Sequence, residues 1–418
     1  MKLRRTKSGS LSKTARPGPT LNFELRTLNS PLKSLVIVGG GFAGVRLIRA
    51  LGRAASRLEI TLVDRREEAV FLPLLPDVVA GKVSLERLLF PLDKFCRSRG
   101  VKFIRGTALR LADGNTLMLA DGREVKFDYL VLAAGAEPNF YGNRDARECG
   151  YTLAGKADAA RLGDRLAEVL SRGTGHTFLV VGGGYTGVET ATALVYAGRR
   201  AARSGSVPFT VRILELAPEI LGNLPEGIAV PARREVARLG IEVTTSARIG
   251  EIGADRVEVD GEDIRDFTLI WSAGMKAVDL AGELDFPRDK QGRLRVDPGL
   301  TLPGSGHILA LGDIACFSAD GAPLRMAVQF SWAEGIKTAR NIRRMLKGNQ
   351  PRPYHPRDYG YLIPCASGKA WGLILGVRVG GRIGSFFHYF MCVLRTLSWK
   401  NRFLLVMELA DLKRVRRR

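Results

Sequence analysis

Two stretches decide the fold of this 418-residue chain: LVIVGGGFAG at residues 35–44 and FLVVGGGYTG at residues 178–187. In each, a short apolar run precedes the pattern G-x-G-x-x-G, and the residues after it read as a helix. This order predicts a strand, a tight turn and a helix. The first glycine permits the turn, the second lets backbone approach a pyrophosphate, and the third packs helix on strand. The duplication predicts two dinucleotides in one protein and electron transfer between them.

An acidic residue follows each loop at the end of the next strand-like run. Asp64 lies 25 residues beyond Gly39, and Glu215 lies 33 residues beyond Gly182. A carboxylate at this place accepts hydrogen bonds from a ribose hydroxyl. The other interpretation of both residues is an ordinary charge at a strand end.

Charge is distributed unevenly along the chain, whose formal net charge is +22. Residues 1–33 carry eight Lys and Arg against one acid, residues 337–418 carry eighteen against three, and residues 34–336 have a net charge of zero. A neutral body with basic ends suits attachment to an anionic surface better than it suits a nucleic-acid-binding body.

Residues 1–33 form a basic N-terminal extension, rich in Ser and Thr, that we expect to be disordered. The extension has no apolar h-region, so it does not read as a secretory signal. Arg4 and Arg5 are not followed by the apolar segment of a twin-arginine signal. A transit-type segment and a misassigned start stay open as alternatives.

Five cysteines are scattered along the chain without close pairing: Cys96, Cys149, Cys316, Cys365 and Cys392. This spacing predicts neither a disulfide framework nor a metal site. The cysteine pair that dithiol-using flavin reductases carry just after the first loop is also missing. We therefore expect each thiol to serve as a small buried hydrophobe.

Four further segments follow the first loop in a characteristic order. They are VDRREEAVFLPLLPDVVAGKVS at 63–84, FDYLVLAAGAEPNFYG at 127–142, TLIWSAGMKA at 268–277 and HILALGDIA at 307–315. From Leu35 to Arg418 the chain resembles the type II NADH:quinone oxidoreductases, single-subunit NADH dehydrogenases that do not pump protons.

The resemblance implies that the first loop holds FAD and the second holds NADH. The expected FAD-binding residues are Gly39, Gly41, Phe42, Ala43, Gly44, Asp64, Ala134, Gly135, Asp313 and Gln329. The expected NADH-binding residues are Gly182, Gly184, Tyr185, Thr186, Gly187, Glu215, Ala273 and Gly274. Asp313 resembles the family aspartate that accepts from the ribityl chain, and a helix N-cap is its other interpretation.

Glu215 also indicates which nicotinamide is used. A carboxylate at this strand end accepts from a free 2′-hydroxyl and repels a 2′-phosphate. No arginine follows Glu215 in the next three residues, although Arg199, Arg200 and Arg203 precede it. We therefore expect NADH to be preferred over NADPH.

The catalytic residues implied by the resemblance are Glu189 and Gln329. Glu189 matches a family glutamate on the nicotinamide side of the flavin, where it tunes the electrostatics or handles protons. An acid in the first turn also stabilises a helix without any catalytic role. Residues 328–335 align with the family motif A-Q-x-A-x-Q-Q-G, which places Ala333 where a glutamine of the quinone pocket is expected, beside Trp332 as a stacking surface or core residue.

The C-terminal region carries two apolar stripes at helical spacing. The first comprises Ile383, Phe386, Phe387, Phe390, Leu394 and Leu397, and the second comprises Phe403, Leu404, Met407 and Ala410. Aromatic-rich amphipathic helices with basic ends suit the bilayer interface, and the stripe between Arg382 and Arg395 is too short to span it. Packing on the protein's own core or in a homodimer is the alternative.

The fold we expect is α/β, with two Rossmann-like domains of the flavoprotein disulfide-reductase type and C-terminal amphipathic helices. The predicted FAD-binding domain is discontinuous, with residues 34–150 and 295–345, and residues 151–294 form the NADH-binding domain. Residues 346–418 form a membrane-anchoring module. This organisation predicts a peripheral membrane protein on the cytoplasmic face of a cell membrane, or on the mitochondrial inner membrane of a eukaryote.

The expected reaction is NADH oxidation by FAD followed by reduction of a membrane quinone. Three alternatives stay open: another FAD-dependent NAD(P)H oxidoreductase with a different acceptor, a sulfide:quinone oxidoreductase, and a flavin-binding regulatory or nucleic-acid-binding protein of the apoptosis-inducing-factor type. The sulfide reaction needs redox cysteines, and Ala154 stands where the first is expected. A nucleic-acid partner is not expected.

Overall fold

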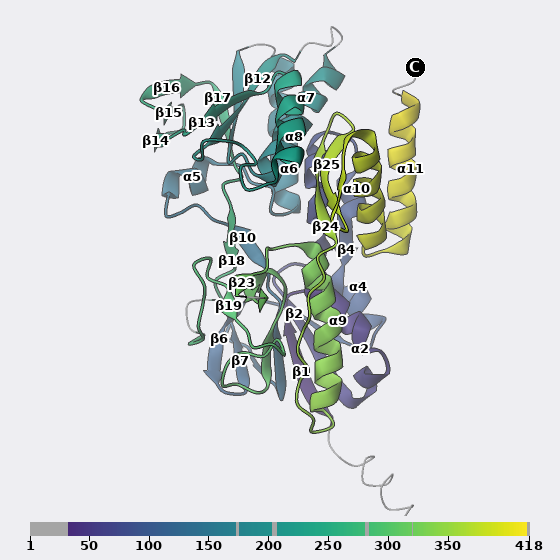
Figure 1. The fold of residues 1–418 in the computed structure, drawn as a ribbon. Coiled ribbons are helices and arrows are strands. Elements are labelled where there is room, and N and C mark those ends of the chain that lie inside the picture. Colours follow the sequence, from purple (N-terminus) through teal and green to yellow (C-terminus); the bar gives the residue numbers. More distant parts are fainter. Residues whose placement is uncertain (1–31, 173–174, 203–206, 281–283, 320, 416–418) are drawn as a thin grey trace, which may run out of the picture.

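The computed structural model describes residues 32–172, 175–202, 207–280, 284–319 and 321–415 (Figure 1). Almost all of the predicted N-terminal extension, residues 1–31, lies outside the described residues. The described chain folds into two α/β units, drawn in the lower and upper halves of Figure 1, with a C-terminal module beside them.

The lower unit is built on a parallel five-stranded sheet of order β20-β9-β1-β2-β5. Its strands are β1 (Lys33–Val38), β2 (Leu58–Asp64), β5 (Lys102–Arg105), β9 (Tyr129–Leu132) and β20 (Ile308–Ala310). Because β20 pairs with β9, the chain returns to the first sheet after passing through the upper unit. The domain boundaries predicted from the sequence stay a proposal.

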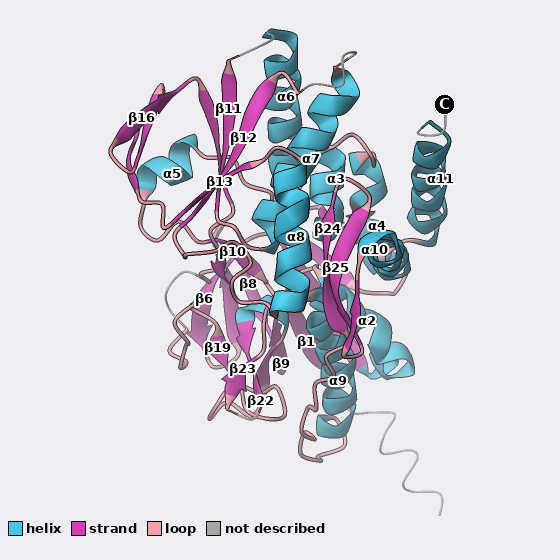
Figure 2. Ribbon diagram, turned by 45° about the horizontal axis from the view of Figure 1, so that its top comes forward, coloured by secondary structure: helices cyan, strands magenta, loops and turns pink. Residues whose placement is uncertain are grey.

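Alternate residues of β1 serve two different cores, which explains the unbroken apolar run in the sequence. Leu35 and Ile37 pack among residues of α2 (Phe42–Leu51) and α9 (Val328–Met345), which lie side by side in Figure 2. Val36 and Val38 point to the opposite face, which the antiparallel sheet β6-β7-β8 covers. A parallel strand buried on both faces needs apolar residues at every position. The covering strands are β6 (Ala108–Asp113), β7 (Thr116–Leu119) and β8 (Glu124–Lys126).

The upper unit repeats this plan with a parallel sheet of order β13-β12-β11-β17. Its strands are β11 (His176–Val181), β12 (Phe209–Glu215), β13 (Glu242–Thr245) and β17 (Phe267–Trp271). Phe178 and Val180 face a core shared with α6 (Lys156–Arg172), α7 (Tyr185–Ala201) and α8 (Glu226–Arg238). Leu179 and Val181 face the other side, among residues of α5 (Arg144–Cys149) and the antiparallel strands β14 (Ile249–Ile252), β15 (Arg256–Val259) and β16 (Glu262–Arg265).

The two units are connected by an antiparallel pair of short strands, β10 (Ala136–Pro138) and β18 (Met275–Ala277). The lower unit also contains the short α-helices α3 (Leu75–Val79) and α4 (Leu92–Arg97). Its short strands are β3 (Glu68–Val70), β4 (Leu89–Pro91), β19 (Leu294–Arg295), β21 (Ala315–Cys316), β22 (Ser318–Ala319) and β23 (Ala322–Pro323).

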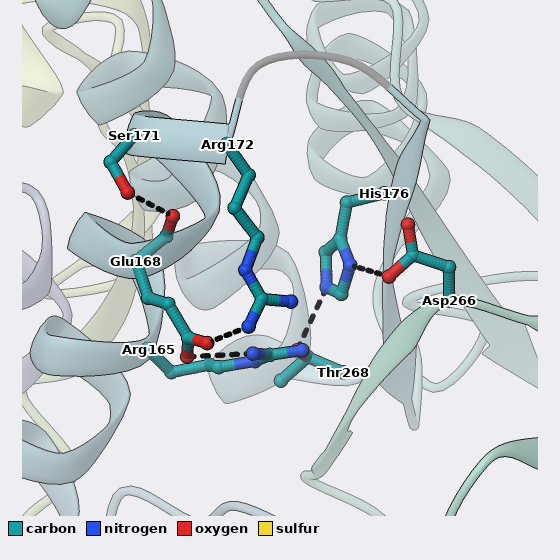
Figure 3. Close-up of polar contacts among 7 residues, drawn as sticks. All are labelled: Arg165, Glu168, Ser171, Arg172, His176, Asp266 and Thr268. Carbon is teal, nitrogen blue, oxygen red and sulfur yellow. Dashed lines mark hydrogen bonds and ion pairs between the residues drawn. The ribbon is translucent and has the colours of Figure 1, made fainter.

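A polar network fastens the outer edge of the upper sheet to α6 (Figure 3). His176 lies 2.8 Å through Nδ1 from Asp266 Oδ1 and 2.9 Å through Nε2 from the hydroxyl of Thr268. Arg165 donates to the same hydroxyl at 2.9 Å and pairs with Glu168. The order Asp-His-Thr resembles a nucleophilic triad, but Thr268 is only 3% exposed and its hydroxyl is engaged by two groups. The network therefore has a structural role, joining the upper sheet to α6.

The C-terminal module consists of a three-stranded antiparallel sheet and two helices. The elements are β24 (Gly360–Cys365), β25 (Lys369–Ile374), β26 (Val377–Val379), α10 (Gly381–Arg395) and α11 (Trp399–Val415). The module contacts both units: β24 packs on α7, β25 packs on α8, and α11 contacts residues 85–88 of the lower unit. In Figure 1, α11 forms the outer edge of the molecule beside α10.

Glu235 on α8 is a buried carboxylate that ties the upper unit to the C-terminal module. It is 3% exposed, accepts from Arg238 Nε at 2.9 Å and from Lys369 Nζ at 2.8 Å. The hydrogen bond from Arg238 is the main reason that the pKa of Glu235 falls to about 2. A depressed carboxyl pKa contributes stability above the unfolded-state value and loses it as the pH falls toward the folded-state value.

We predict that Glu235→Gln lowers the free energy of unfolding at pH 7 by about 1.5–3 kcal/mol, because hydrogen bonds between charged groups are lost. The deficit should shrink as the pH falls from about 5 toward 2, where wild type also protonates Glu235. Urea unfolding at several pH values measures this. Asp93→Asn, which breaks an exposed pair with Arg97, is the matched control and should cost under about 1 kcal/mol. If Glu235→Gln lowered the free energy of unfolding equally at pH 7 and pH 3, the depressed pKa of Glu235 would be contradicted.

Candidate active site

The first glycine loop has the geometry that its sequence predicts. Gly39 has φ +108°, and a Cβ there would lie 2.2 Å from the carbonyl oxygen of Ala133. A Cβ on Gly44 would lie 2.0 Å from the carbonyl oxygen of Gly39. A Cβ on Gly41 would meet nothing within 4 Å. The first and third glycines are therefore required by the protein itself, whereas the second faces open space that a ligand can enter.

The second loop repeats these contacts almost atom for atom. Gly182 has φ +101°, and its Cβ would lie 2.6 Å from the carbonyl oxygen of Ser272. The Cβ of Gly187 would lie 1.8 Å from the Gly182 carbonyl oxygen, and that of Gly184 would meet nothing within 4 Å. Two independent loops thus present the same opening.

Each opening lies at the N-terminus of a helix without a side-chain cap. Gly41 precedes α2 and Gly184 precedes α7, and neither helix start has a side-chain hydrogen bond to its first amides. Unpaired N–H groups and the positive end of the helix dipole make such a terminus an anion site. The residues present therefore fit a pyrophosphate at both places.

The first helical residues beyond the second glycines have different surroundings. Phe42 meets Phe71 edge to face at 5.6 Å, and Tyr185 stacks on Tyr361 of the C-terminal module at 5.5 Å between ring centroids. Ala43 is buried under α9, and the carbonyl oxygen of Thr186 accepts from Thr190. These residues directly follow the two open glycines, and their predicted cofactor-binding role stays a prediction.

The two acids at the strand ends hold the loops by the same device. Asp64 accepts from Gly40 N at 2.7 Å and from Arg66 N at 2.8 Å. Glu215 accepts from Gly183 N at 2.6 Å and from Ala217 N at 2.8 Å. Each carboxylate oxygen has a second lone pair for a ribose hydroxyl. The ligand-binding role and the structural role are therefore compatible in one residue.

Backbone turns with positive φ flank the connection between the units. Gly135 has φ +81° with open space at its Cβ position, and Ala134 before it is half-buried. Gly274 has φ +130°, and its Cβ would lie 2.9 Å from the hydroxyl of Tyr141. That hydroxyl donates to the Ala273 carbonyl at 3.1 Å. Tyr141, which the sequence did not single out, closes this turn from the opposite unit while 69% exposed.

Two carboxyls lie close together where the chain turns after β20. Gly312 has φ +75°, and its N–H donates to Glu334 on α9 at 2.6 Å. Burial raises the pKa of Asp313 to about 6, opposed by a hydrogen bond with Ser331. Burial likewise raises the pKa of Glu334 to about 8, and the hydrogen bond from Gly312 opposes it. Asp313 is partly exposed and available to a ligand hydroxyl, whereas Glu334 is 4% exposed and supports the turn from behind.

The residues predicted for the acceptor side, all on α9, contact different parts of the protein. Gln329 is buried and its amide donates to Asp358 at 2.9 Å and accepts from Tyr359 N at 3.0 Å. Trp332 lies under the guanidinium of Arg46 at 5.0 Å. Ala333 packs against a separate small core of Leu300, Phe317 and Tyr354. The catalytic role of Gln329 stays a prediction, and its amide is occupied in shaping the start of β24.

Glu189, in the first turns of α7, lies at the wall of a small cavity between the two units and the C-terminal module. The cavity is lined by Pro73, Pro76, Asp77, Glu189, Ala193, Pro364, Cys365, Ala366 and Tyr389. Burial, and next the neighbouring charge of Asp77, raise the pKa of Glu189 well above its usual value. Both causes favour the protonated form of the Glu189 carboxyl over the ionised form.

Three residues of this cavity region were missed by the sequence reasoning: Asp77, Lys82 and Tyr389. Asp77 and Lys82 lie in the 63–84 segment that was quoted only for its resemblance, and Tyr389 lies in the C-terminal helix that was read as a membrane anchor. A lysine and an aspartate five residues apart follow no helical or strand periodicity, so the sequence gives no sign that they form a buried pair. Only the packing of three separate segments reveals it.

Comparison with known proteins agrees with this geometry. The family described as pyridine nucleotide-disulphide oxidoreductase matches residues 33–344. A type II NADH:quinone oxidoreductase of Staphylococcus aureus (strain NCTC 8325 / PS 47) is 24% identical over 375 residues, covering 85% of this chain and 92% of that protein. The solved structure of NDH2 from Plasmodium falciparum in complex with NADH superposes with a TM-score of 0.82 at 17% identity, over 92% of this chain and 98% of that one.

A second solved structure, the sulfide:quinone oxidoreductase from Aquifex aeolicus, has a TM-score of 0.74 at 19% identity and covers 88% of this chain and 91% of that chain. At these identities the two solved structures establish the fold alone. Both share the arrangement of two α/β units that the sequence predicts.

We predict that Glu334→Gln makes the protein's stability less sensitive to pH. With a folded-state pKa of about 8, wild type holds a proton that the unfolded chain releases near 4.5, so stability falls as the pH rises between these values. Glutamine keeps an oxygen for the Gly312 N–H and does not titrate. Relative to wild type, the free energy of unfolding of the variant should therefore rise by about 1–3 kcal/mol between pH 5 and pH 8.

Thermal unfolding of both proteins across this pH range checks the prediction. Glu124→Gln on β8 changes an exposed glutamate and should leave the pH dependence unchanged. Parallel curves for wild type and Glu334→Gln would show that Glu334 is already ionised in the folded protein.

Proposed function

Because the chain belongs to the pyridine nucleotide-disulphide oxidoreductase family, we propose that it oxidises NADH through FAD and passes two electrons to a membrane quinone without pumping protons. The observation that carries the proposal is the duplicated opening at Gly41 and Gly184, each at an uncapped helix start with a loop-bound acid beside it. Two dinucleotides in one chain are what internal electron transfer requires.

FAD is assigned to the lower unit and NADH to the upper unit. Asp313 supports this assignment, because it belongs to the lower unit and offers a partly exposed carboxyl beside the first loop. Bound FAD would supply hydride acceptance, which is the chemistry that amino-acid side chains lack. The protein's own contribution is to fix the two nucleotides by their phosphates and riboses.

The acceptor is proposed to reach the protein from a membrane surface. On α10 the residues Ile383, Phe386, Phe390 and Leu394 are 66%, 59%, 47% and 44% exposed, and the rings of Phe386 and Phe390 stack at 6.1 Å. On α11 the residues Trp399, Phe403, Val406 and Met407 are 82%, 66%, 47% and 47% exposed. These two rows form the apolar face of the C-terminal module. An apolar face of two helices suits insertion into a bilayer interface.

Two details of the predicted stripes differ from the expectation. Leu397 is 7% exposed and packs in the core of the lower unit, since it lies in the turn after α10. Phe387 and Leu404 are half-buried, whereas Trp399 and Val406 are exposed. Among the described helices, none is both long and apolar enough to cross a membrane. We propose peripheral attachment through the exposed apolar residues of α10 and α11.

The cysteines weigh against the sulfide-oxidising alternative. All five are free, and burial raises the pKa of Cys365, the cysteine that lines the Glu189 cavity, to about 12. Redox cysteines need an accessible thiolate. Steady-state assays with NADH and a short-chain quinone, NADH and ferricyanide, and sulfide and quinone test the proposal against this alternative. Turnover of sulfide, or a failure of NADH to reduce any quinone, would overturn it.

We predict that NADH has a kcat/KM at least about 10-fold above that of NADPH, which corresponds to about 1.4 kcal/mol. Glu215 should accept from the ribose 2′-hydroxyl and repel a 2′-phosphate. Glu215→Gln removes the charge and should narrow the ratio severalfold, measured by steady-state kinetics with both nucleotides. Glu219→Gln, four residues away and paired with Arg233, is the matched control and should leave the ratio unchanged. Equal efficiencies in wild type would refute the role of Glu215.

We predict that Phe386→Glu combined with Phe403→Glu releases the protein from anionic vesicles, because both side chains are exposed on the apolar face and would carry charge into the interface. NADH-to-ferricyanide activity should persist, since both side chains are more than half exposed. Vesicle co-sedimentation and the ferricyanide assay provide the two readouts. Val243→Glu, an exposed apolar residue on β13, is the control. Full vesicle binding by the double variant would place the attachment elsewhere.

A further inference from the structure

Tyr141 is an exposed aromatic residue held in a strained backbone conformation near the second glycine loop. It lies in the loop between β10 and α5, where it is 69% exposed and has φ +52°. A positive φ is uncommon for a residue with a large side chain, and such strain persists only where the surrounding contacts enforce it. Residues strained in this way cluster at active sites and ligand clamps.

Contacts on the inner side fix the loop around Tyr141. Phe140 stacks on Trp271 at 5.7 Å between ring centroids, and the Trp271 indole N–H donates to the Asn139 carbonyl at 2.8 Å. The Asn139 side chain accepts from Tyr141 N at 3.0 Å, and the Asn139 backbone N–H donates to the Gly274 carbonyl at 2.9 Å. These contacts pack the ring of Phe140 and leave the next ring along the chain exposed to solvent.

The Tyr141 hydroxyl reaches the turn that follows β17. It donates to the Ala273 carbonyl at 3.1 Å, and a Cβ on Gly274 would lie 2.9 Å from it. The same turn touches the second glycine loop, because a Cβ on Gly182 would lie 2.6 Å from the Ser272 carbonyl oxygen and 2.9 Å from Ala273 Cα. A continuous series of contacts therefore joins Tyr141 to the second glycine loop.

The order of the upper sheet decides which half of a dinucleotide would meet this turn. The second glycine loop follows β11, which lies between β12 and β17. Glu215 ends β12 on one side of the loop, and the Ala273–Gly274 turn follows β17 on the other. All three places lie at the carboxyl edge of parallel strands, where nucleotides bind. With the pyrophosphate at Gly184 and the adenosine ribose at Glu215, the nicotinamide half would extend toward β17.

We propose that Tyr141 is a substrate-binding residue whose exposed ring stacks against the nicotinamide half of NADH and holds it over the Ala273–Gly274 turn. This inference rests on the NADH-oxidising function proposed above. A ring fixed at one end by its hydroxyl offers a flat apolar surface to a heterocycle, and it loses little side-chain entropy on binding. The strained backbone at Tyr141 presents that surface to a ligand instead of burying it in the core.

The experiment measures the affinity of the purified, FAD-containing protein for NAD⁺ and for ADP by isothermal titration calorimetry. ADP carries the adenosine and pyrophosphate groups without the nicotinamide. Tyr141→Asn removes the ring and keeps the turn, since asparagine tolerates positive φ, and Tyr141→Phe keeps the ring. Leu375→Asn is the matched control, because Leu375 lies in the turn between β25 and β26 with φ +50° and is 70% exposed.

Tyr141→Asn should raise the dissociation constant for NAD⁺ by about 3- to 10-fold, as loss of one aromatic contact does, and leave that for ADP unchanged. Tyr141→Phe should bind NAD⁺ within about twofold of wild type. The KM for NADH in the ferricyanide assay should follow the same pattern. The melting temperature of Tyr141→Asn should match or exceed that of wild type, because the substitution relieves backbone strain. Leu375→Asn should bind both ligands as wild type does.

Unchanged NAD⁺ affinity in Tyr141→Asn would overturn the inference. Equal weakening of NAD⁺ and ADP binding, or a lower melting temperature together with loss of NAD⁺ affinity in Tyr141→Phe, would also overturn it, since Tyr141 would then only support the turn. In each of these cases NADH oxidation by wild type would still uphold the proposed function. A wild type that binds ADP but neither binds NAD⁺ nor oxidises NADH would remove the proposed function and this inference together.

Discussion

The contact between the first and third glycines of each loop is the constraint on which the molecule depends. The Gly39 carbonyl oxygen occupies the place of a Gly44 side chain, and Gly182 stands in the same relation to Gly187. This approach brings each helix start against the end of the central strand of its sheet. It therefore fixes an uncapped helix terminus, the acid at the end of the neighbouring strand and the open second glycine in one place, twice in one chain.

The C-terminal module packs against both of the duplicated units. Its strands pack on α7 and α8, and its helix α10 reaches α3 through the hydrogen bond from Tyr389 to Asp77. The same helix also carries exposed apolar residues such as Phe386. One helix of fifteen residues therefore has a face suited to a bilayer and a face that closes the Glu189 cavity.

Buried carboxyls in this protein have opposite properties because their partners differ. Glu235 receives hydrogen bonds from two cationic side chains, so its pKa falls to about 2. Glu334 receives one backbone N–H and lies near Asp313, so burial dominates and its pKa rises to about 8. Burial, and next the neighbouring charge of Asp77, raise the pKa of Glu189 as well. Burial raises the pKa of a carboxyl unless cationic donors outweigh it, as they do only at Glu235 among these three acids.

The sequence by itself determined the parts that depend on local spacing. Apolar runs, the glycine pattern and the acids Asp64 and Glu215 follow from the backbone geometry of a strand, a turn and a helix, so they are readable within about thirty residues. Tertiary structure alone decided which distant residues meet. Asp77 and Tyr389 are 312 residues apart, and Leu397, predicted as part of a surface stripe, is buried. Such contacts depend on how whole helices and strands pack. The 3.6-residue repeat of apolar residues shows which side of a helix is apolar, but it does not show what that side contacts.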